Sequence, residues 1–139
     1  MAESRILFEL ATPNRLLVSE EVEEVVAPGT EGCFGVLPGH APFLTTLRSG
    51  EVVYRTGRQE RHLAVNGGFA EVRPEKVIIL AESAERPEEI DRQRALKAKE
   101  RAEARLARKT QEEIDYTRAL AAFGRALTRI RVADRSSRR

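Results

Sequence analysis

The chain has 139 residues, of which 41% are hydrophobic, 33% are charged and only 5% are aromatic. This length predicts one domain, or a small domain with an appendage, and the composition excludes collagen-like, low-complexity and disulfide-stapled proteins. No apolar run approaches the roughly 18 residues that span a bilayer, and the first residues lack the features of a signal peptide. Because Cys33 is the only cysteine, no intrachain disulfide can form, and a reducing cytoplasm is expected.

Charge and turn-forming residues divide the chain near residues 83–87. Residues 1–84 carry 8 Lys/Arg against 12 Asp/Glu, whereas residues 85–139 carry 16 against 10. Eight of the nine glycines also lie before residue 85. We therefore expect two domains, residues 1–84 and residues 85–139.

The first of these domains is predicted to be an antiparallel β-sandwich. Short apolar or alternating runs recur at roughly 8–12-residue spacing with turn signals between them, which is typical of a sandwich or barrel. One of the expected turns is Asn66-Gly67-Gly68. The expected strands lie at residues 6–10, 16–18, 22–26, 33–37, 43–47, 51–55, 62–65, 69–72 and 77–80.

The second domain is predicted to be an antiparallel two-helix hairpin, which makes the fold α+β in two segregated parts. Residues 88–109 contain no Gly or Pro and are rich in helix formers, and Pro87 suits a first helical position. Residues 110–113 have the form of a capping box that restarts a helix. After Val132 we expect a basic, disordered tail. The predicted contact is between a small-residue stripe, Ala95, Ala98, Ala102 and Leu106, and a bulkier stripe, Tyr116, Leu120, Phe123, Leu127 and Ile130.

The sequence offers no catalytic or metal-binding motif. Gly29, Gly32 and Gly35 are not followed by the Lys-Ser/Thr pair of a phosphate-binding loop. The two histidines, His40 and His62, are far apart and have only one cysteine to complete a metal site. No serine lies in a G-x-S-x-G motif. We therefore expect no catalytic residue, no metal ion and no catalytic cofactor.

The arginine-rich second half leaves several functions open. It can be a solvated hairpin with i,i+4 ion pairs, or it can bind an acidic protein surface, a small anion or nucleic acid. Nucleic acid is the least favoured partner, because ten acids are interleaved with the basic residues. In addition, Tyr116 and Phe123 belong to the apolar stripe and are not free to stack on bases.

Residues 28–45, PGTEGCFGVLPGHAPFLT, closely resemble the signature stretch of the epsilon subunit of bacterial F-type ATP synthase, as do residues 67–72, GGFAEV. The likeness extends over the whole chain except the basic tail. It implies a non-catalytic central-stalk subunit of a proton-translocating rotary enzyme, peripheral on the cytoplasmic face of the cell membrane. The implied partners are the gamma subunit, the membrane rotor c-ring, and the alpha and beta subunits of the catalytic head. The hairpin would either fold onto the sandwich or extend along gamma and inhibit ATP hydrolysis.

Residues 90–95, IDRQRA, are similar to the I/L-D-x-x-R-A motif with which some bacterial epsilon subunits bind ATP as a regulatory ligand. This likeness assigns Ile90, Asp91, Arg94 and Ala95 to such a site. The positions that resemble the remainder of that site are Glu85, Arg101, Arg125 and Arg129.

Residue spacing supports the site independently of the motif. Arg94 and Arg101 are two helical turns apart, and Arg125 and Arg129 are at i,i+4, so each pair shares one face of its helix. In an antiparallel hairpin the four guanidinium groups can converge, and guanidinium groups bind phosphate bidentately. Two alternatives stay open. Asp91 can simply pair with Arg94 on an exposed face, and the whole chain can be a freestanding adaptor that binds an acidic protein surface.

Overall fold

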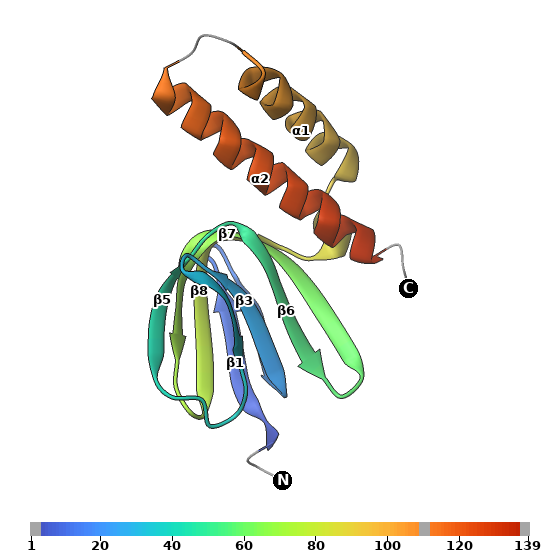
Figure 1. Ribbon diagram of the computed structural model, residues 1–139. Coiled ribbons are helices and arrows are strands. Elements are labelled where there is room, and N and C mark those ends of the chain that lie inside the picture. The colour runs from blue at the N-terminus through green and yellow to red at the C-terminus, as the bar shows by residue number, and fades with distance from the viewer. Residues whose placement is uncertain (1–3, 109–111, 137–139) are drawn as a thin grey trace. The chain divides into compact units, whose positions relative to one another are not determined.

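The computed structural model describes residues 4–108 and 112–136. The chain forms two compact units that divide after Glu85. The first is a β-sandwich and the second a helical hairpin (Figure 1), which confirms the predicted fold class. The strands of the described residues are β1 Ile6–Ala11, β2 Leu16–Val22, β3 Glu24–Gly29, β4 Gly32–Val36, β5 Phe43–Leu47, β6 Gly50–Thr56, β7 Gln59–Val72 and β8 Lys76–Glu85.

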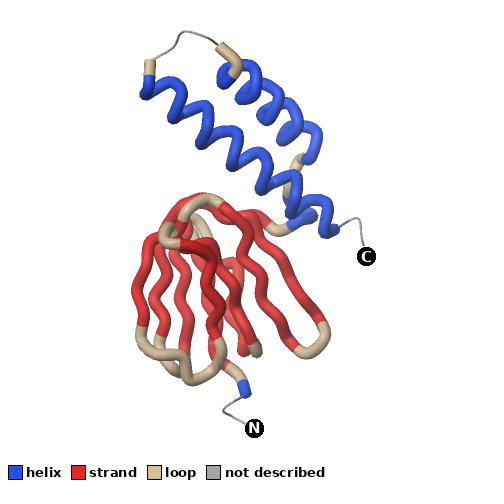
Figure 2. Tube along the Cα trace, viewed as in Figure 1, coloured by secondary structure: helices blue, strands red, loops and turns tan. Residues whose placement is uncertain are grey.

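The strands form two layers that share β7 (Figure 2). One layer has the order β2-β1-β8-β7-β5, and β6, β3 and β4 form the other, in which β6 pairs with the first half of β7. The pairing of β1 with β8 is parallel, and the other strand pairings of the described residues are antiparallel. The sandwich is therefore mixed at this one pair, where an all-antiparallel arrangement was expected.

Two glycines let β7 pass from one layer to the other. The sequence predicts a turn at Asn66-Gly67-Gly68, but β7 runs through these residues as a single strand, so this prediction is wrong. Gly67 and Gly68 have φ of +64° and +115°, in the region that favours glycine. A Cβ on Gly68 would lie 2.1 Å from the carbonyl oxygen of Leu80. The glycines therefore form a bulge that bends the strand at a corner of the sandwich.

Alternating side chains of both layers fill the core. In β1, Ile6, Phe8 and Leu10 are buried, while the residues between them are half-buried. The rings of Phe8 and Tyr54 lie 5.2 Å apart between centroids and join the two layers. This alternation follows from the two-residue period of a strand with one face on the core.

The hairpin begins later along the chain than the sequence predicts. A single turn of 3-10 helix, η2 (Pro87–Glu89), comes first, and α1 (Arg92–Leu106) starts only after the extended Ile90. This turn is a separate short element, and its first residues are capped by the Glu89 carboxylate, which accepts a hydrogen bond from the Arg86 backbone N–H at 2.8 Å. Pro87 therefore occupies the first position of η2 and not of the long helix.

The second helix, α2 (Glu113–Ser136), continues past the expected start of the tail. Residues 133–136 are helical, so the prediction of disorder after Val132 is wrong for these four residues, and the remaining tail lies outside the described residues. The first two residues of the predicted capping box, Thr110 and Gln111, also lie outside them.

The two helices meet through alanines. Ala95 and Ala102 of α1 are buried, as the small-residue stripe predicts, and α2 also contributes alanines, Ala119 and Ala126. Within the predicted bulky stripe, Tyr116 and Leu120 are exposed, so the expectation that the stripe packs on α1 is wrong for these two residues, while Phe123, Leu127 and Ile130 are half-buried. Small residues on both helices allow their backbones to approach closely.

Gly68→Ala tests the corner of the sandwich. The new methyl group would meet the Leu80 carbonyl, so we expect the free energy of unfolding to fall by about 3 kcal/mol or more. Gly57 is the matched control, because its φ is also positive at +64° but no heavy atom lies within 4 Å of its Cβ position. Gly57→Ala should cost only about 1 kcal/mol. Urea unfolding measures both, and equal losses would contradict the role of close approach.

Candidate functional site

The register of the hairpin is set by contacts at both of its ends. The Arg92 guanidinium, at the start of α1, donates a 2.7 Å hydrogen bond to the Asp134 carboxylate, near the end of α2. This bond raises the pKa of Arg92 above its usual value. At the other end, Arg105 and Arg108 of α1 line a pocket together with residues of the first turns of α2. The helices are therefore antiparallel neighbours along most of α1.

One long side of the hairpin is lined by arginines. Arg94 and Arg101 directly precede the buried Ala95 and Ala102, and Arg125 directly precedes Ala126. In two antiparallel right-handed helices, the residues that precede the facing ones lie on the same side of the pair. Residues three, four or seven positions apart share one side of a helix. The arginine edge, as we name it, consists of Arg94, Arg101 and Arg105 of α1, Arg108 just beyond the C-cap of α1, and Arg118, Arg125 and Arg129 of α2.

This geometry places four of the predicted ligand residues on one edge. Counted from the Arg92–Asp134 contact, Arg101 lies at about the level of Arg125, and Arg94 lies within about one turn of Arg129. Arg94 and Arg101 are exposed, while Arg125 and Arg129 are half-buried. The arrangement can present guanidinium groups from both helices to a single anion.

The remaining predicted residues hold the backbone of this region. Asp91 caps α1, because its carboxylate accepts a 3.1 Å hydrogen bond from the backbone N–H of Arg94. Ala95 is buried against α2, and Ile90 is extended and half-buried between η2 and α1. Glu85 is the last residue of β8, in the first unit, where it pairs with Ala64.

The cap changes the interpretation of Asp91. The sequence left open a side-chain pair between Asp91 and Arg94, but the Asp91 carboxylate accepts its hydrogen bond from the Arg94 backbone. Asp91 therefore fixes where α1 starts, and through it the position of Arg94. An Asn or Ser could serve the same purpose, since both are good N-cap residues.

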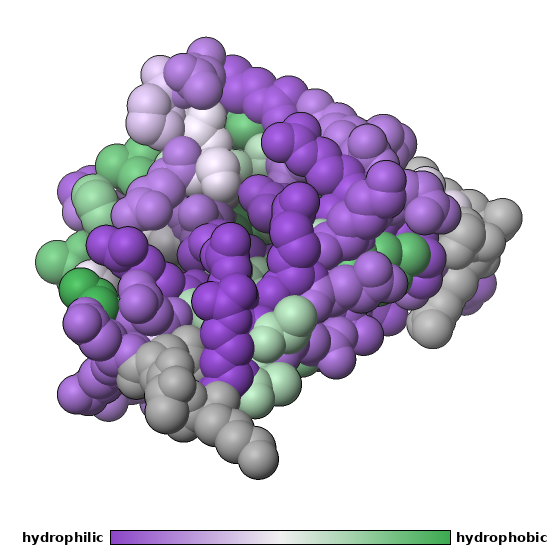
Figure 3. Space-filling view, turned by 90° about the horizontal axis from the view of Figure 1, so that it is seen from above, coloured by the Kyte–Doolittle hydropathy of each residue, from purple (hydrophilic) through white to green (hydrophobic). Residues whose placement is uncertain are grey.

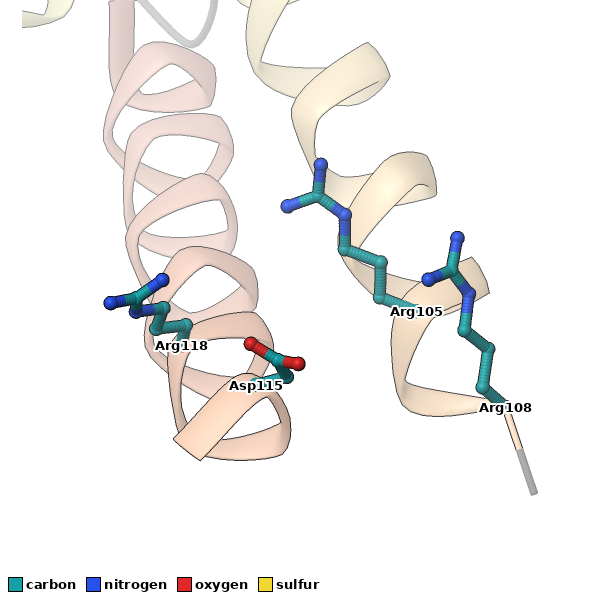
Figure 4. Close-up of a pocket in the computed structure, with 4 residues that line it drawn as sticks. All are labelled: Arg105, Arg108, Asp115 and Arg118. Carbon is teal, nitrogen blue, oxygen red and sulfur yellow. The ribbon is translucent and has the colours of Figure 1, made fainter. Parts of the chain in front are cut away.

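A second cluster lies at the loop end of the arginine edge (Figure 4). Among the described residues, a pocket of about 330 Å³ is lined by Arg105 of α1, by Arg108 just beyond it, and by Asp115 and Arg118 of α2. Figure 4 shows Asp115 on the side of α2 that is nearer to α1. No sequence pattern predicted this pocket. The i,i+4 spacing of Arg101 and Arg105 was a usable signal, but the partner residues follow only from the register.

The opposite edge of the hairpin is apolar. Leu120 and Leu127 of α2 directly follow the buried Ala119 and Ala126, and so turn away from the arginines. Tyr116 and Leu120 are 45% and 51% exposed. We name this surface the apolar edge; its residues are Tyr116, Leu120, Phe123, Leu127 and Ile130.

The sandwich also carries an exposed apolar surface, on the outside of the layer that contains β1 and β8. Ala11, Leu80, Phe69 and Thr46 are register partners in adjacent strands and therefore share one face. Leu80 and Phe69 are 43% and 46% exposed. A groove of about 500 Å³ crosses this face, lined by Ala11, Thr12, Pro13, Gly68, Phe69, Leu80, Ala81 and Glu82.

The face of the molecule drawn in Figure 3 is largely hydrophilic, with small groups of hydrophobic residues among the polar ones. Among residues 4–108 and 112–136, no three His, Cys, Asp or Glu side chains are grouped to hold a metal ion. In the same residues, no helix is both long and apolar enough to cross a membrane.

Comparison with known proteins identifies this pair of domains. The family model for the β-sandwich domain of the ATP synthase delta/epsilon chain matches residues 5–87, and the model for the long α-helix domain of the same chain matches residues 88–134. Among curated proteins, the ATP synthase epsilon chain of Geobacter metallireducens is 50% identical over the full length of both chains. That of Nitratidesulfovibrio vulgaris is 53% identical over 94% of this chain and 96% of its own.

The fold of the chain is also similar to that of a solved ATP synthase subunit. A chain of the Euglena gracilis mitochondrial ATP synthase, in a structure of OSCP, F1 and the c-ring, superposes with a TM-score of 0.79 at 24% identity, over 98% of this chain and 82% of that one. The chain belongs to the ATP synthase delta/epsilon family, as an epsilon subunit of the F-type enzyme. It is a central-stalk subunit of an enzyme complex and is not itself catalytic.

Ala126→Leu tests the alanine contact that builds both edges. Leucine at this buried position overpacks the interface, so we expect the hairpin to lose about 1–3 kcal/mol of stability. Ala121→Leu, on the exposed side of the same helix, is the matched control and should have little effect. Thermal melting of the helical signal by circular dichroism measures both, and equal melting temperatures for the two variants would contradict the packing described above.

Proposed function

We propose that the hairpin makes this central-stalk subunit an ATP-sensitive inhibitor of ATP hydrolysis. ATP binds on the arginine edge of the folded hairpin, with its phosphates between Arg94 and Arg101 of one helix and Arg125 and Arg129 of the other. Ile90 gives apolar contact, and Asp91 and Ala95 fix the backbone and the close helix packing. ATP is a regulatory ligand here and not a substrate.

The observation that carries this proposal is the placement of the four arginines on one side of the pair. Charge-assisted bonds from guanidinium groups are among the strongest that phosphate accepts. They converge only while the alanine faces of α1 and α2 are together. ATP therefore stabilises the folded hairpin by RT ln(1 + [L]/Kd), which is about 2.7 kcal/mol at a hundredfold excess over Kd. At low ATP the hairpin is released, extends along the gamma subunit and blocks hydrolysis.

The surfaces outside this site support the proposed partners. The groove and the apolar row on β1, β8 and β7 form a docking face for the gamma subunit, since exposed apolar patches of this kind mark protein contacts. The sandwich also contacts the membrane rotor c-ring, which makes the chain peripheral on the cytoplasmic side of a proton-transporting complex. The extended hairpin meets the alpha and beta subunits of the catalytic head. A freestanding adaptor is less well supported, because the relatives that match the full chain are epsilon chains.

Arginine substitutions test the ATP site. Arg94→Ala and Arg125→Ala each remove a charged hydrogen bond, worth about 1.5–3 kcal/mol, so ATP should bind about ten- to a hundredfold more weakly. Arg131→Ala, on the exposed side of α2, is the matched control. Isothermal titration calorimetry of the full chain gives the affinities. No heat with millimolar ATP, or unchanged affinity in Arg125→Ala, would rule out the site.

A charge on the outer face of the sandwich tests the gamma contact. Leu80→Glu places a carboxylate in the apolar row without disturbing the core, because this side chain points outward and is 43% exposed. We expect binding of the gamma subunit to weaken at least about tenfold. Ile114→Glu, at another exposed apolar residue, serves as the control. Surface plasmon resonance against purified gamma measures both, and the face is not the contact if Leu80→Glu binds like the parent chain.

A further inference from the structure

The loop-end pocket has the composition of an anion site. Among the described residues, three arginines and one aspartate line a pocket of about 330 Å³, and they come from both arms of the hairpin. Arg105 lies in the last turn of α1 and Arg108 follows the C-cap residue Ala107, while Asp115 and Arg118 are one turn apart on α2. A ligand in the pocket would therefore touch both helices at the end opposite to the proposed ATP site.

Some cations of the chain are paired, as Arg55 is with Glu23 at 2.6 Å and Arg92 with Asp134 at 2.7 Å. Within the described part of the chain, by contrast, no ion pair joins the side chain of Arg108, Asp115 or Arg118 to another residue. The pocket thus keeps guanidinium donors and one carboxylate acceptor available at its wall.

A carboxylate beside three guanidinium groups favours one kind of anion. A fully ionised anion such as sulfate offers only acceptors and is repelled by the carboxylate. Phosphate still carries a proton near neutral pH, so that its hydroxyl group can donate to a carboxylate while its other oxygens accept from arginine forks. The presence of Asp115 therefore distinguishes phosphate from sulfate.

We propose that the loop-end pocket binds inorganic phosphate, with Arg105, Arg108 and Arg118 as donors and Asp115 as the acceptor that selects the protonated anion. Phosphate is consumed in ATP synthesis and released in ATP hydrolysis, so a chain of this family works where its concentration changes. Bound phosphate would tie the end of α1 to the start of α2. This site needs neither the ATP site nor its arginines.

The test is a titration of the full chain with inorganic phosphate, at pH 7 and constant ionic strength, monitored through the arginine Nε–Hε signals in NMR spectra. We expect saturable shifts of the pocket arginines with phosphate, and binding of sulfate at least about tenfold weaker. Arg118→Ala should weaken phosphate binding about tenfold. Arg131→Ala, outside the pocket, and Arg94→Ala, in the proposed ATP site, should leave it unchanged, so failure of one site is separable from failure of the other.

Asp115→Asn distinguishes selection from simple attraction. An amide supplies N–H donors, so we expect sulfate to bind this variant about as well as phosphate. Equal binding of the two anions to the parent chain overturns the proposal, as does phosphate binding that Arg118→Ala leaves intact. The proposal is also overturned if Arg105→Ala and Arg108→Ala lower only the helix content, because the arginines then serve to stabilise the end of α1. Pyrophosphate and ATP, titrated in parallel, establish whether the pocket takes free phosphate or a phosphoryl group of a larger ligand.

Discussion

The packing of α1 on α2, with Ala95 and Ala102 buried on one helix and Ala119 and Ala126 on the other, determines which side chains the hairpin exposes. Because each pair is spaced by seven residues, it keeps the same face of its helix toward the partner over two turns. The residues on either side of these alanines then form the two edges. Arginines collect on one edge and large apolar side chains on the other.

This contact is also thin, and that suits a part of the molecule that is proposed to move. Alanine side chains bury little apolar area, so the helix pair gains less from packing than a leucine-lined pair would. Segments with few buried apolar contacts are the ones that open at low cost in free energy. A ligand that stabilises the folded hairpin by only a few kcal/mol can therefore shift the equilibrium between the folded and the extended form. The sandwich differs, since its closed core and paired strands make it a fixed platform for contacts with the rest of the stalk.

Most of the fold follows from local sequence signals, and the failures involve residues that are far apart in the chain. Strand alternation and turn residues predict the sandwich, and the alanines of α1 predict its buried face. The bulge at Gly67 and Gly68 has the local signature of a turn, and only the approach of Leu80 from β8 makes it a bend within one strand. The alanine face of α2 was missed because Leu120 and Leu127, one residue later, give the stronger apolar pattern.

The candidate sites, like the fold, follow only in part from local sequence signals. The motif and the i,i+4 spacing predict which arginines share a face within one helix, but the loop-end pocket depends on the register between helices, which Arg92 and Asp134 help to set. The role of Asp91 as a helix cap could be recognised only once the first residue of α1 was known. The sequence does not show this residue, because residues 88–91 also look like part of a helix. Helix propensity varies smoothly along a chain, whereas a cap depends on one hydrogen bond.

The central claim is that ATP binds the arginine edge only when the two alanine faces are together. Amide hydrogen exchange of the full chain, with and without ATP, tests this claim most directly. If ATP binds the folded hairpin alone, a hundredfold excess over Kd should slow exchange of the α1 and α2 amides by up to about a hundredfold and leave the β-strand amides unchanged. Protection of α1 and α2 that stays the same when ATP is bound would contradict it.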